Sequence, residues 1–312
     1  MSAPIIVVTG ASGFLGGHVV ARLQVEGWHV RAVTRRAHAA TADEIVVWRD
    51  ASDESAIRMA CEGADAVVHL AAHAHVFDAG AKRSGEMARA NIAGAGTVAT
   101  AAAHAGVKRL LLVSSVGARD ESNPAHGYAW SKRASEVRVR ECVAGTDTDV
   151  VIVRPPLVYG EGMKGRPLRL FHLVSRGFPV PTVDGSNARS VAYVGNVAAS
   201  IGYLVSPGTC VPDSAIYPAD AEPMSTVALT RAIADALGVR TRVIRVPRSL
   251  LLAVASVGTL TRRRVVPVNL EDVRRALGSL VVDSSGAYPE DKAPFTTEEG
   301  LRRTARWFAA TR

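Results

Sequence analysis

Two side chains that can exchange a proton with an alcohol or a ketone stand four residues apart, Tyr128 and Lys132, at the start of a predicted helix. A separation of four residues places both on one helix face. A phenol with an ordinary pKa of ~10 is a poor base at neutral pH, but a neighbouring ammonium favours the phenolate. We therefore expect the pKa of Tyr128 to be lowered, so that it serves as a general acid or base. Ser115, at the end of a predicted strand, could hydrogen-bond the same substrate oxygen.

A glycine-rich turn, Thr9-Gly10-Ala-Ser-Gly13-Phe-Leu-Gly16, follows the first predicted strand and opens the first predicted helix. Glycine permits a positive φ and a close approach to a pyrophosphate, and a helix N-terminus offers free N–H groups and a positive dipole end. The spacing G-x-x-G-x-x-G is a variant of the dinucleotide fingerprint, and a glycine turn without a ligand is the alternative. The predicted cofactor contacts are Gly10, Ser12, Gly13, Phe14, Leu15 and Gly16.

The residues after the second predicted strand, Thr34-Arg35-Arg36, bear on the choice of cofactor. An acid there selects NAD, whereas an arginine accommodates the extra phosphate of NADP. The sequence therefore favours NADP(H), with Arg35 as the contact and NAD(H) as the alternative; both arginines could instead be merely solvated. Asp50, after the third strand, could bind the adenine amine or cap a helix.

Elements that would position these residues alternate along the first half of the chain: short runs of Val, Ile and Leu are separated by Ala-rich segments of helical period. The expected strands are 5–9, 30–34, 45–48, 66–70, 109–114 and 150–154, and the expected helices are 13–26, 54–61, 82–105 and 128–142. This alternation predicts an α/β fold of the Rossmann type, a doubly wound parallel sheet.

Proline- and glycine-rich loops after Arg154 indicate a domain boundary. We predict a dinucleotide-binding domain over 1–155 with a return segment at about 188–205, and a smaller substrate-binding domain over 156–187 and 206–312. Helical stretches in the second part are expected at 225–237, 250–260, 270–277 and 298–308, too short and irregular for a second sheet-based core.

The chain has 312 residues, 48% of them apolar and 21% charged, which excludes a disordered or collagen-like protein. Its formal charge of +8 would suit nucleic acid, an anionic membrane surface or a phosphorylated small molecule. With 5% aromatic residues and no recognised module, nucleic acid is not expected as a partner. No export leader or transmembrane span is evident, so a cytoplasmic protein is expected.

Several other patterns have a plain structural interpretation. Three well-separated cysteines (Cys61, Cys142 and Cys210) support neither a disulfide framework nor a zinc site. The set His69, His73 and His75 could ligate a metal, but no acidic or cysteine partner is near, so no metal is predicted. The apolar run 250–260 followed by Arg262-Arg-Arg264 could dock on an anionic membrane, although a buried helix ending in a solvated basic turn is favoured.

Together, these motifs resemble the extended short-chain dehydrogenase/reductase family, and especially its nucleotide-sugar epimerase, dehydratase and 4-ketoreductase branch. The resemblance covers nearly the whole chain and rests on 9–16, His69-Leu-Ala-Ala72, Asn91 with Gly94 and Thr97, Val113-Ser-Ser115, 128–132, Arg154-Pro-Pro-Leu-Val-Tyr-Gly160 and Ala188-Arg-Ser-Val-Ala-Tyr-Val194.

The resemblance implies that Ser115, Tyr128 and Lys132 are catalytic, with Lys132 also holding the nicotinamide ribose. Asn91 would support the site through a helix and an ordered water. Further cofactor contacts are expected at Leu70, Ala71, Ala72 and Pro155. Arg189 would bind the diphosphate of a sugar nucleotide, consistent with bidentate arginine–phosphate pairing, and Leu157 would contact the substrate. A homodimer is expected by resemblance only.

Departures from the family pattern narrow the activity. Val116-Gly117 stand where many sugar-nucleotide dehydratases carry acidic residues, which disfavours dehydration. Leu157 replaces an asparagine of many epimerases, and the second strand lacks their terminal acid. The leading hypothesis is a 4-keto-sugar reductase acting at C4 of a nucleoside-diphosphate sugar. The alternatives are a UDP-sugar 4-epimerase with tightly bound NAD, a reductase of a non-sugar ketone, and a non-catalytic dinucleotide sensor.

Overall fold

A computed structural model describes residues 3–36, 41–49, 53–72, 81–120, 127–183, 185, 187–260, 273 and 277–311. Its contacts divide the chain into two units, each described by itself below. The first unit comprises Met1–Pro156, Val194–Pro218 and Ser284–Pro294, and the second comprises Leu157–Tyr193, Ala219–Asp283 and Phe295–Arg312.

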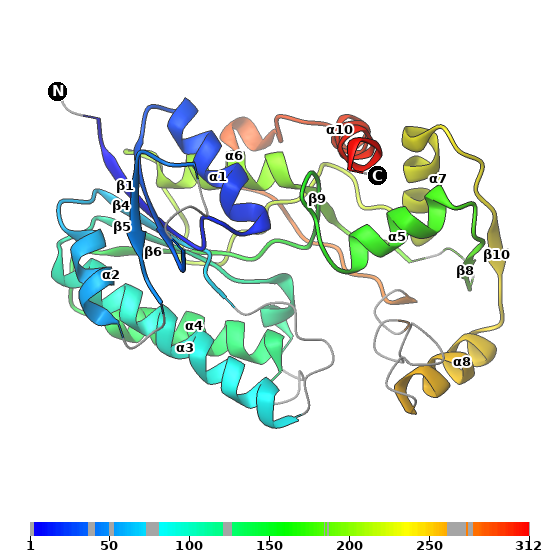
Figure 1. The fold of residues 1–312 in the computed structure, drawn as a ribbon, viewed down its shortest axis with the longest axis horizontal. Helices are drawn as coiled ribbons and strands as arrows, with labels where there is room; N and C mark the ends of the chain where they lie inside the picture. The colour runs from blue at the N-terminus through cyan, green and yellow to red at the C-terminus, as the bar shows by residue number, and fades with distance from the viewer. Residues whose placement is uncertain are drawn as a thin grey trace. The chain divides into compact units, whose positions relative to one another are not determined.

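The described strands of the first unit form a six-stranded parallel sheet in the order β3-β2-β1-β4-β5-β6 (Figure 1). Their bounds are β1 Ile5–Thr9, β2 His29–Thr34, β3 Glu44–Val47, β4 Ala66–His69, β5 Arg109–Val113 and β6 Asp149–Val153. The strands are short runs of mostly buried Val, Ile, Leu and Ala, as expected for a sheet covered on both faces. The predicted α/β, doubly wound fold is confirmed.

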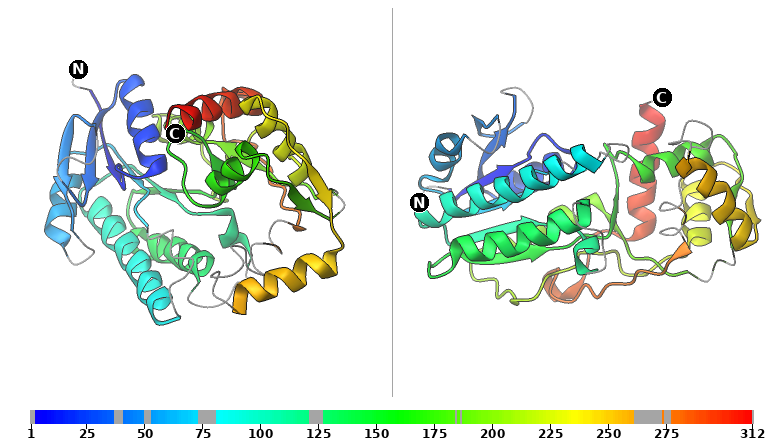
Figure 2. Two further views of the ribbon diagram at one scale, coloured as in Figure 1. Left: turned by 45° about the vertical axis from the view of Figure 1, so that its right-hand side comes forward. Right: turned by 90° about the horizontal axis from the view of Figure 1, so that it is seen from below.

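Helices cover both faces of this sheet. The helix bounds are α1 Phe14–Val25, α2 Glu54–Cys61, α3 Ala81–His104, α4 Tyr128–Val143 and α6 Val194–Val205. Helices α3 and α4 lie side by side (Figures 1 and 2), and with α2 they enclose a core that includes Val67 and Leu110. Helix α1 packs against α6. Since the strands are parallel, the loops after β1, β4 and β5 emerge at one edge of the sheet, where ligands bind in such folds.

The second unit contains two small parallel sheets that the sequence did not predict. Strand β7 (Leu157–Tyr159) pairs with β9 (Val191–Tyr193), and β8 (Val180–Thr182) pairs with β10 (Val243–Arg245). Helix α5 (Arg166–Ser175) was also missed, because Gly165 and Pro167 suggest a loop; a proline is tolerated in the first helical turn. Helices α7 (Thr226–Leu237) and α10 (Thr297–Ala310) pack together, and α5 packs on α7.

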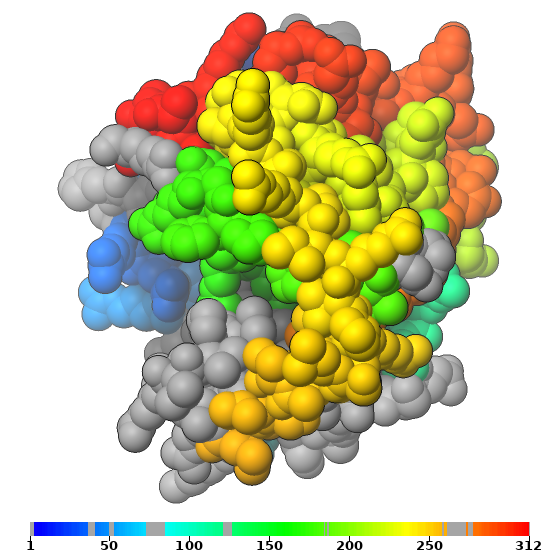
Figure 3. Space-filling model, turned by 90° about the vertical axis from the view of Figure 1, so that its right-hand side faces the viewer, coloured from blue at the N-terminus to red at the C-terminus, as the bar shows by residue number. Residues whose placement is uncertain are grey.

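The apolar run after β10 forms helix α8 (Arg248–Leu260), and its prediction as a buried helix is wrong. Among its described side chains only that of Ala255 is fully buried, while Leu250 and Leu260 are exposed. Helix α8 makes no extensive contact with any other described helix or strand, and with β10 it lies on the surface in Figure 3. The basic turn Arg262-Arg-Arg264 lies outside the described residues.

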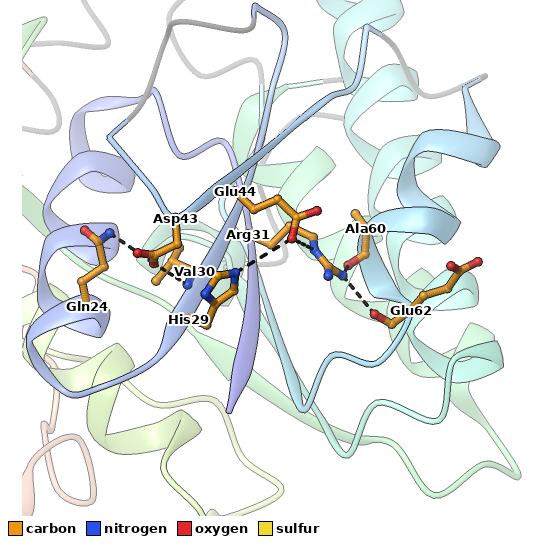
Figure 4. A network of polar contacts seen from close by, with 8 residues as sticks. All are labelled: Gln24, His29, Val30, Arg31, Asp43, Glu44, Ala60 and Glu62. Atoms are coloured by element: carbon orange, nitrogen blue, oxygen red, sulfur yellow. Dashed lines mark hydrogen bonds and ion pairs between the residues drawn. The ribbon is translucent and has the colours of Figure 1, made fainter. Parts of the chain in front are cut away.

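A polar network ties the outer strand β3 to its neighbours in the first unit (Figure 4). The Asp43 carboxylate accepts the Val30 N–H at 2.8 Å, which lowers the pKa of Asp43. Arg31 pairs with Glu44 across β2 and β3 at 2.7 Å and donates to the carbonyl of Ala60 in α2 at 2.6 Å. These contacts hold β2, β3 and α2 in register at the sheet edge.

Candidate active site

The glycine-rich turn is a tight loop against the end of β4. Gly10 has φ +72°, and a Cβ there would lie 2.7 Å from the Ala71 nitrogen. A Cβ on Gly16 would lie 2.2 Å from the Gly10 carbonyl oxygen. Glycine is therefore required at both positions, by backbone conformation at Gly10 and by close approach at Gly16. The Gly10 N–H donates to the Val33 carbonyl at 3.2 Å, which sets the loop beside the end of β2.

The N-terminus of α1 fits a dinucleotide phosphate. Gly13 is its N-cap residue, and no described side chain caps the helix there. The first N–H groups of a helix lack intrahelical acceptors and carry the positive end of the dipole. Ser12 and Gly13 are exposed, and Phe14 and Leu15 are partly exposed. The loop therefore presents donors to an anion while its glycines keep side chains out of the way.

The remaining predicted cofactor residues, apart from Asp50 and Lys132, follow the ends of three strands of the sheet. Leu70, Ala71 and Ala72 follow β4 and are partly exposed, and the Leu70 N–H donates to the Thr9 carbonyl at 3.1 Å. Arg35 follows β2 and is exposed. Pro155 follows β6, and its carbonyl accepts the Val116 N–H at 3.0 Å. Asp50 lies outside the described residues.

The buried side chain of His69 contacts Thr9, the residue directly before the glycine-rich loop. His69 Nδ1 and Thr9 Oγ1 are 2.7 Å apart, and Thr9 Oγ1 also accepts the Ala71 N–H at 3.3 Å. A hydroxyl can accept two hydrogen bonds, so the donor between Thr9 Oγ1 and Nδ1 depends on the His69 tautomer. Burial, reinforced by the Lys132 charge, lowers the pKa of His69 to about 3. His69 is therefore neutral and structural; His73 and His75 lie outside the described residues.

Lys132 is fixed at the end of β5. Its ammonium donates to the Val113 carbonyl at 2.8 Å and is buried. Two residues further on, Ser115 Oγ accepts the Gly117 N–H at 3.3 Å, so the hydroxyl hydrogen points elsewhere and can be donated. A Cβ on Gly117 would lie 3.2 Å from the Ala129 methyl, so the Ser115 turn packs against the start of α4. The structure thus brings Ser115, Tyr128 and Lys132 to one place.

The expected lowering of the Tyr128 pKa is wrong for this arrangement. Desolvation raises the pKa of Tyr128 to about 12. The Lys132 ammonium lies 6.0 Å from the centroid of the phenol ring and is engaged by the Val113 carbonyl, so burial dominates. Tyr128 is nevertheless 41% exposed, so part of the ring contacts solvent. At neutral pH the phenol is protonated and within reach of solvent.

Asn91 connects α3 to the start of α4. Its Nδ2 donates to Ser131 Oγ at 3.3 Å, and that hydroxyl donates to the Tyr128 carbonyl at 2.8 Å. Asn91 and Ser131 are both buried. Asn91 therefore steadies the first turn of α4; its predicted role through an ordered water stays a prediction.

The sequence did not predict an ion pair that forms one helical turn beyond Lys132. Glu136, one turn after Lys132, accepts from Arg154 Nε at 2.9 Å and from its Nη2 in a bidentate pair, and Arg154 also donates to the Tyr217 hydroxyl at 2.9 Å. Burial lowers the pKa of Lys132 to about 8, while the Glu136 charge raises it. The i, i+4 spacing could have suggested that the Glu136 carboxylate lies near Lys132. The partner of Glu136, Arg154, lies between β6 and β7 and is distant in sequence, so the ion pair itself could not be predicted.

The two predicted substrate contacts outside the first unit lie in the second. Leu157 is half-buried in β7, paired with Val191 of β9. The Arg189 guanidinium donates to the Gly278 carbonyl at 2.8 Å, and its backbone N–H donates to the Met224 carbonyl. Their roles toward a substrate remain predictions.

The described residues also bear on the predictions of no metal site, no disulfide framework and no transmembrane span. These residues hold no group of three or more His, Cys, Asp or Glu side chains arranged to bind a metal ion. The three cysteines are free, and burial raises the pKa of Cys61 to about 12. Among the described helices, none combines the length and apolar character needed to span a bilayer.

Comparison with known proteins gives a consistent assignment. Residues 6–208 match the family model of the NAD dependent epimerase/dehydratase family. The chain is 29% identical to UDP-glucose 4-epimerase of Vibrio cholerae, over 97% of this chain and 95% of that protein. It is 30% identical to ceramide reductase of Caulobacter vibrioides, over 98% and 95%. The fold matches UDP-glucose 4-epimerase of Thermotoga maritima, solved with UDP-glucose, with a TM-score of 0.72 at 20% identity, over 98% and 99%.

The matched region contains the loop at α1, Lys132 and the Tyr128 helix, which are the parts that fit a dinucleotide and proton transfer. The chain therefore belongs to the NAD dependent epimerase/dehydratase family and is an enzyme of the extended short-chain dehydrogenase/reductase type.

Proposed function

We propose that this enzyme reduces a ketone at C4 of a nucleoside-diphosphate sugar, with NADP(H) as the preferred cofactor. The observation that carries the proposal is the Tyr128 phenol, held protonated at neutral pH beside an ammonium fixed to the end of β5. A protonated phenol is the form that donates a proton to a ketone oxygen.

In this mechanism the residues of the chain bind, orient and move one proton. Gly10, Gly13 and the α1 N-terminus would hold the pyrophosphate of the dinucleotide, whose nicotinamide, when bound, supplies a hydride or accepts one. The Ser115 hydroxyl donates a hydrogen bond to the ketone oxygen, and Tyr128 gives that oxygen its phenolic proton. Lys132 stabilises the phenolate that remains, because its ammonium stands on the same helix face.

A UDP-sugar 4-epimerase is the second candidate, favoured by the similarity to UDP-glucose 4-epimerase of Vibrio cholerae. The same side chains would remove the proton from the C4 hydroxyl and later return it to that oxygen. The hydride would pass from C4 to the retained nicotinamide and, after the keto sugar turns in the site, return to the other face of that carbon. That chemistry requires a retained cofactor, whereas reduction requires cofactor exchange. An oxidised nicotinamide would add a positive charge that favours the phenolate needed for the first step.

A ketone on an apolar substrate is the third candidate, favoured by the similarity to ceramide reductase over 98% of the chain. Arg189 is the residue that would discriminate between the substrate classes. If it binds a diphosphate, Arg189→Ala should abolish binding of sugar nucleotides. A homodimer formed through α3 and α4 is a further proposal, which sedimentation analysis would test.

The first experiment is to denature the purified protein and identify any released dinucleotide by mass spectrometry. The nucleotide-free protein is then titrated with NADPH and NADH and assayed on 4-keto sugar nucleotides. The proposal is supported if the purified protein releases no dinucleotide, binds NADPH more tightly than NADH and reduces the ketone. Stoichiometric bound NAD would overturn the reductase assignment in favour of the epimerase.

Replacing the proton donor tests the mechanism under either assignment. We expect Tyr128→Phe to lower kcat by ~10²-fold or more, because general acid catalysis typically contributes that much, while the Kd for dinucleotide stays unchanged. Tyr203→Phe, a half-buried tyrosine in α6 of the same unit, is the matched control and should keep its turnover. Normal turnover in Tyr128→Phe would exclude this residue as the proton donor.

A further inference from the structure

One segment of the second unit has a charge pattern unlike the rest of the chain. Residues 236–270 contain seven arginines and no acidic residue, so the remainder of the chain has a formal charge of only +1. Four of these arginines, Arg240, Arg242, Arg245 and Arg248, lie in described positions and are all exposed. The excess charge of the protein is therefore concentrated around β10 and α8, away from the residues assigned to proton transfer in the sequence.

Helix α8, in the centre of this segment, exposes an apolar stripe. Leu250, Val254, Val257 and Leu260 are 54%, 43%, 44% and 83% exposed. Their spacing of four, three and three residues places them on one helix face, and the buried Ala255 lies on the opposite face. A stripe of large apolar side chains left to water has an energetic cost that a partner surface would remove.

The arginines and the apolar stripe belong to one surface. Figure 3 shows β10 and α8 adjoining on the same face of the molecule. Arg242 and Arg245 flank Ile244, itself 46% exposed, and Arg248 begins α8. Basic residues next to a helix with one apolar face are typical of segments that lie in a membrane interface.

The charge distinguishes among the possible partners. A second copy of this chain would bring the four exposed arginines against four others, which is repulsive. Nucleic acid would satisfy the arginines but leaves the apolar stripe without a role. An anionic bilayer satisfies both, because acyl chains accept the stripe and phosphate headgroups attract the arginines.

We propose that α8 and the exposed arginines Arg240, Arg242, Arg245 and Arg248 form an interfacial anchor that docks this enzyme on an anionic phospholipid surface. With 13 residues, α8 is ~20 Å long, shorter than the ~30 Å hydrocarbon core, so it lies in the interface rather than across it. The anchor is independent of the proposed reaction: it determines where the enzyme works, not which bond it changes.

Co-sedimentation with lipid vesicles tests the anchor on the full chain. We expect binding to vesicles of phosphatidylcholine and phosphatidylglycerol, weakened by salt, and little binding to phosphatidylcholine alone. Arg242→Gln with Arg245→Gln should weaken binding ~30-fold, since each arginine near an anionic surface contributes about a factor of five. Arg58→Gln with Arg302→Gln, exposed arginines outside the segment, is the matched control and should bind as the parent does.

The apolar stripe needs its own variant. Val254→Ser with Val257→Ser should lower vesicle affinity ~10-fold or more, whereas Val25→Ser with Met59→Ser, exposed apolar residues of the first unit, should not. Dinucleotide binding and turnover of a water-soluble substrate should be unchanged in every variant, which separates failure of the anchor from failure of the proposed reaction. Equal binding to neutral and anionic vesicles, or loss of self-association instead of vesicle binding in the stripe variant, would overturn the proposal.

Discussion

At Lys132, burial and a neighbouring carboxylate act on the pKa in opposite directions. Burial lowers the pKa to about 8, and Glu136 opposes this shift. Lys132 therefore loses its charge at the upper edge of the physiological range. Because the ammonium favours the phenolate of Tyr128, the activity should decline as pH rises through the pKa of Lys132.

Glu136→Gln tests this balance. Removing the charge should lower the pKa of Lys132 below about 8, so the alkaline limb of the kcat profile moves to lower pH. Gln can still accept a hydrogen bond from Arg154, but loss of the buried ion pair should lower the free energy of unfolding by roughly 3 kcal/mol at most. Glu141→Gln, exposed on the same helix, is the control and should leave the profile in place. An unmoved limb in Glu136→Gln would limit Glu136 to a structural role.

Arg35 is exposed and follows β2 directly. The end of β2 adjoins the glycine-rich loop, because the Gly10 N–H donates to the Val33 carbonyl, so Arg35 bears on the choice of cofactor. If it contacts the extra phosphate of NADPH, Arg35→Ala should weaken NADPH binding by ~10- to 100-fold, the value of a charge-assisted hydrogen bond, and leave NADH binding nearly unchanged. Fluorescence titration with both cofactors measures this, with Arg58→Ala as the matched loss of one charge. A parallel loss for both cofactors would argue against NADPH selection by Arg35.

At the scale of elements, two neighbouring glycines of α1 provide a matched pair. A Cβ on Gly16 would overlap the Gly10 carbonyl oxygen at 2.2 Å, whereas a Cβ on Gly17 meets nothing within 4 Å. We expect Gly16→Ala to destabilise the fold by about 1–3 kcal/mol and to abolish dinucleotide binding. Gly17→Ala should be neutral or stabilising by up to ~1 kcal/mol, since alanine favours helix. Denaturant unfolding and cofactor titration of both variants would detect the difference, and equal behaviour would contradict the tight packing of this loop.

At the scale of the whole molecule, His69 couples stability to pH. Its pKa is about 3 in the folded protein against 6.5 when unfolded, so between these values the unfolded chain binds more protons. Stability is then complete above pH 6.5 and is lost progressively as pH falls toward 3. Between pH 7.5 and 5.5 this group should reduce the free energy of unfolding by about 1.4 kcal/mol.

His69→Gln removes the titration and keeps a side chain that can accept from the Thr9 hydroxyl or donate to it. Between pH 7.5 and 5.5, the unfolding free energy of this variant should fall by about 1.4 kcal/mol less than that of the parent. His104→Gln, an exposed histidine at the end of α3, should retain the parent's pH dependence. Identical pH dependence in all three proteins would show that His69 titrates normally in the folded state.

The sequence by itself determined the six strands, the helices between them, the glycine-rich turn and the placement of Tyr128 and Lys132 on one helix face. These features are local: a strand of buried Val and Ile, a turn that needs Gly10, or an i, i+4 pair is specified within a few residues. The fold class and the family resemblance followed from their order along the chain.

Only the tertiary structure decided the electrostatics of the site and the exposure of the second unit. The raised pKa of Tyr128 and the pairing of Glu136 with Arg154 depend on which atoms surround each group. The same reason explains the short sheets β7–β9 and β8–β10 and the exposed stripe of α8, an apolar helix whose sequence suits burial. Burial is a property of contacts between distant segments, so hydrophobicity along one helix cannot determine whether protein or another surface covers it.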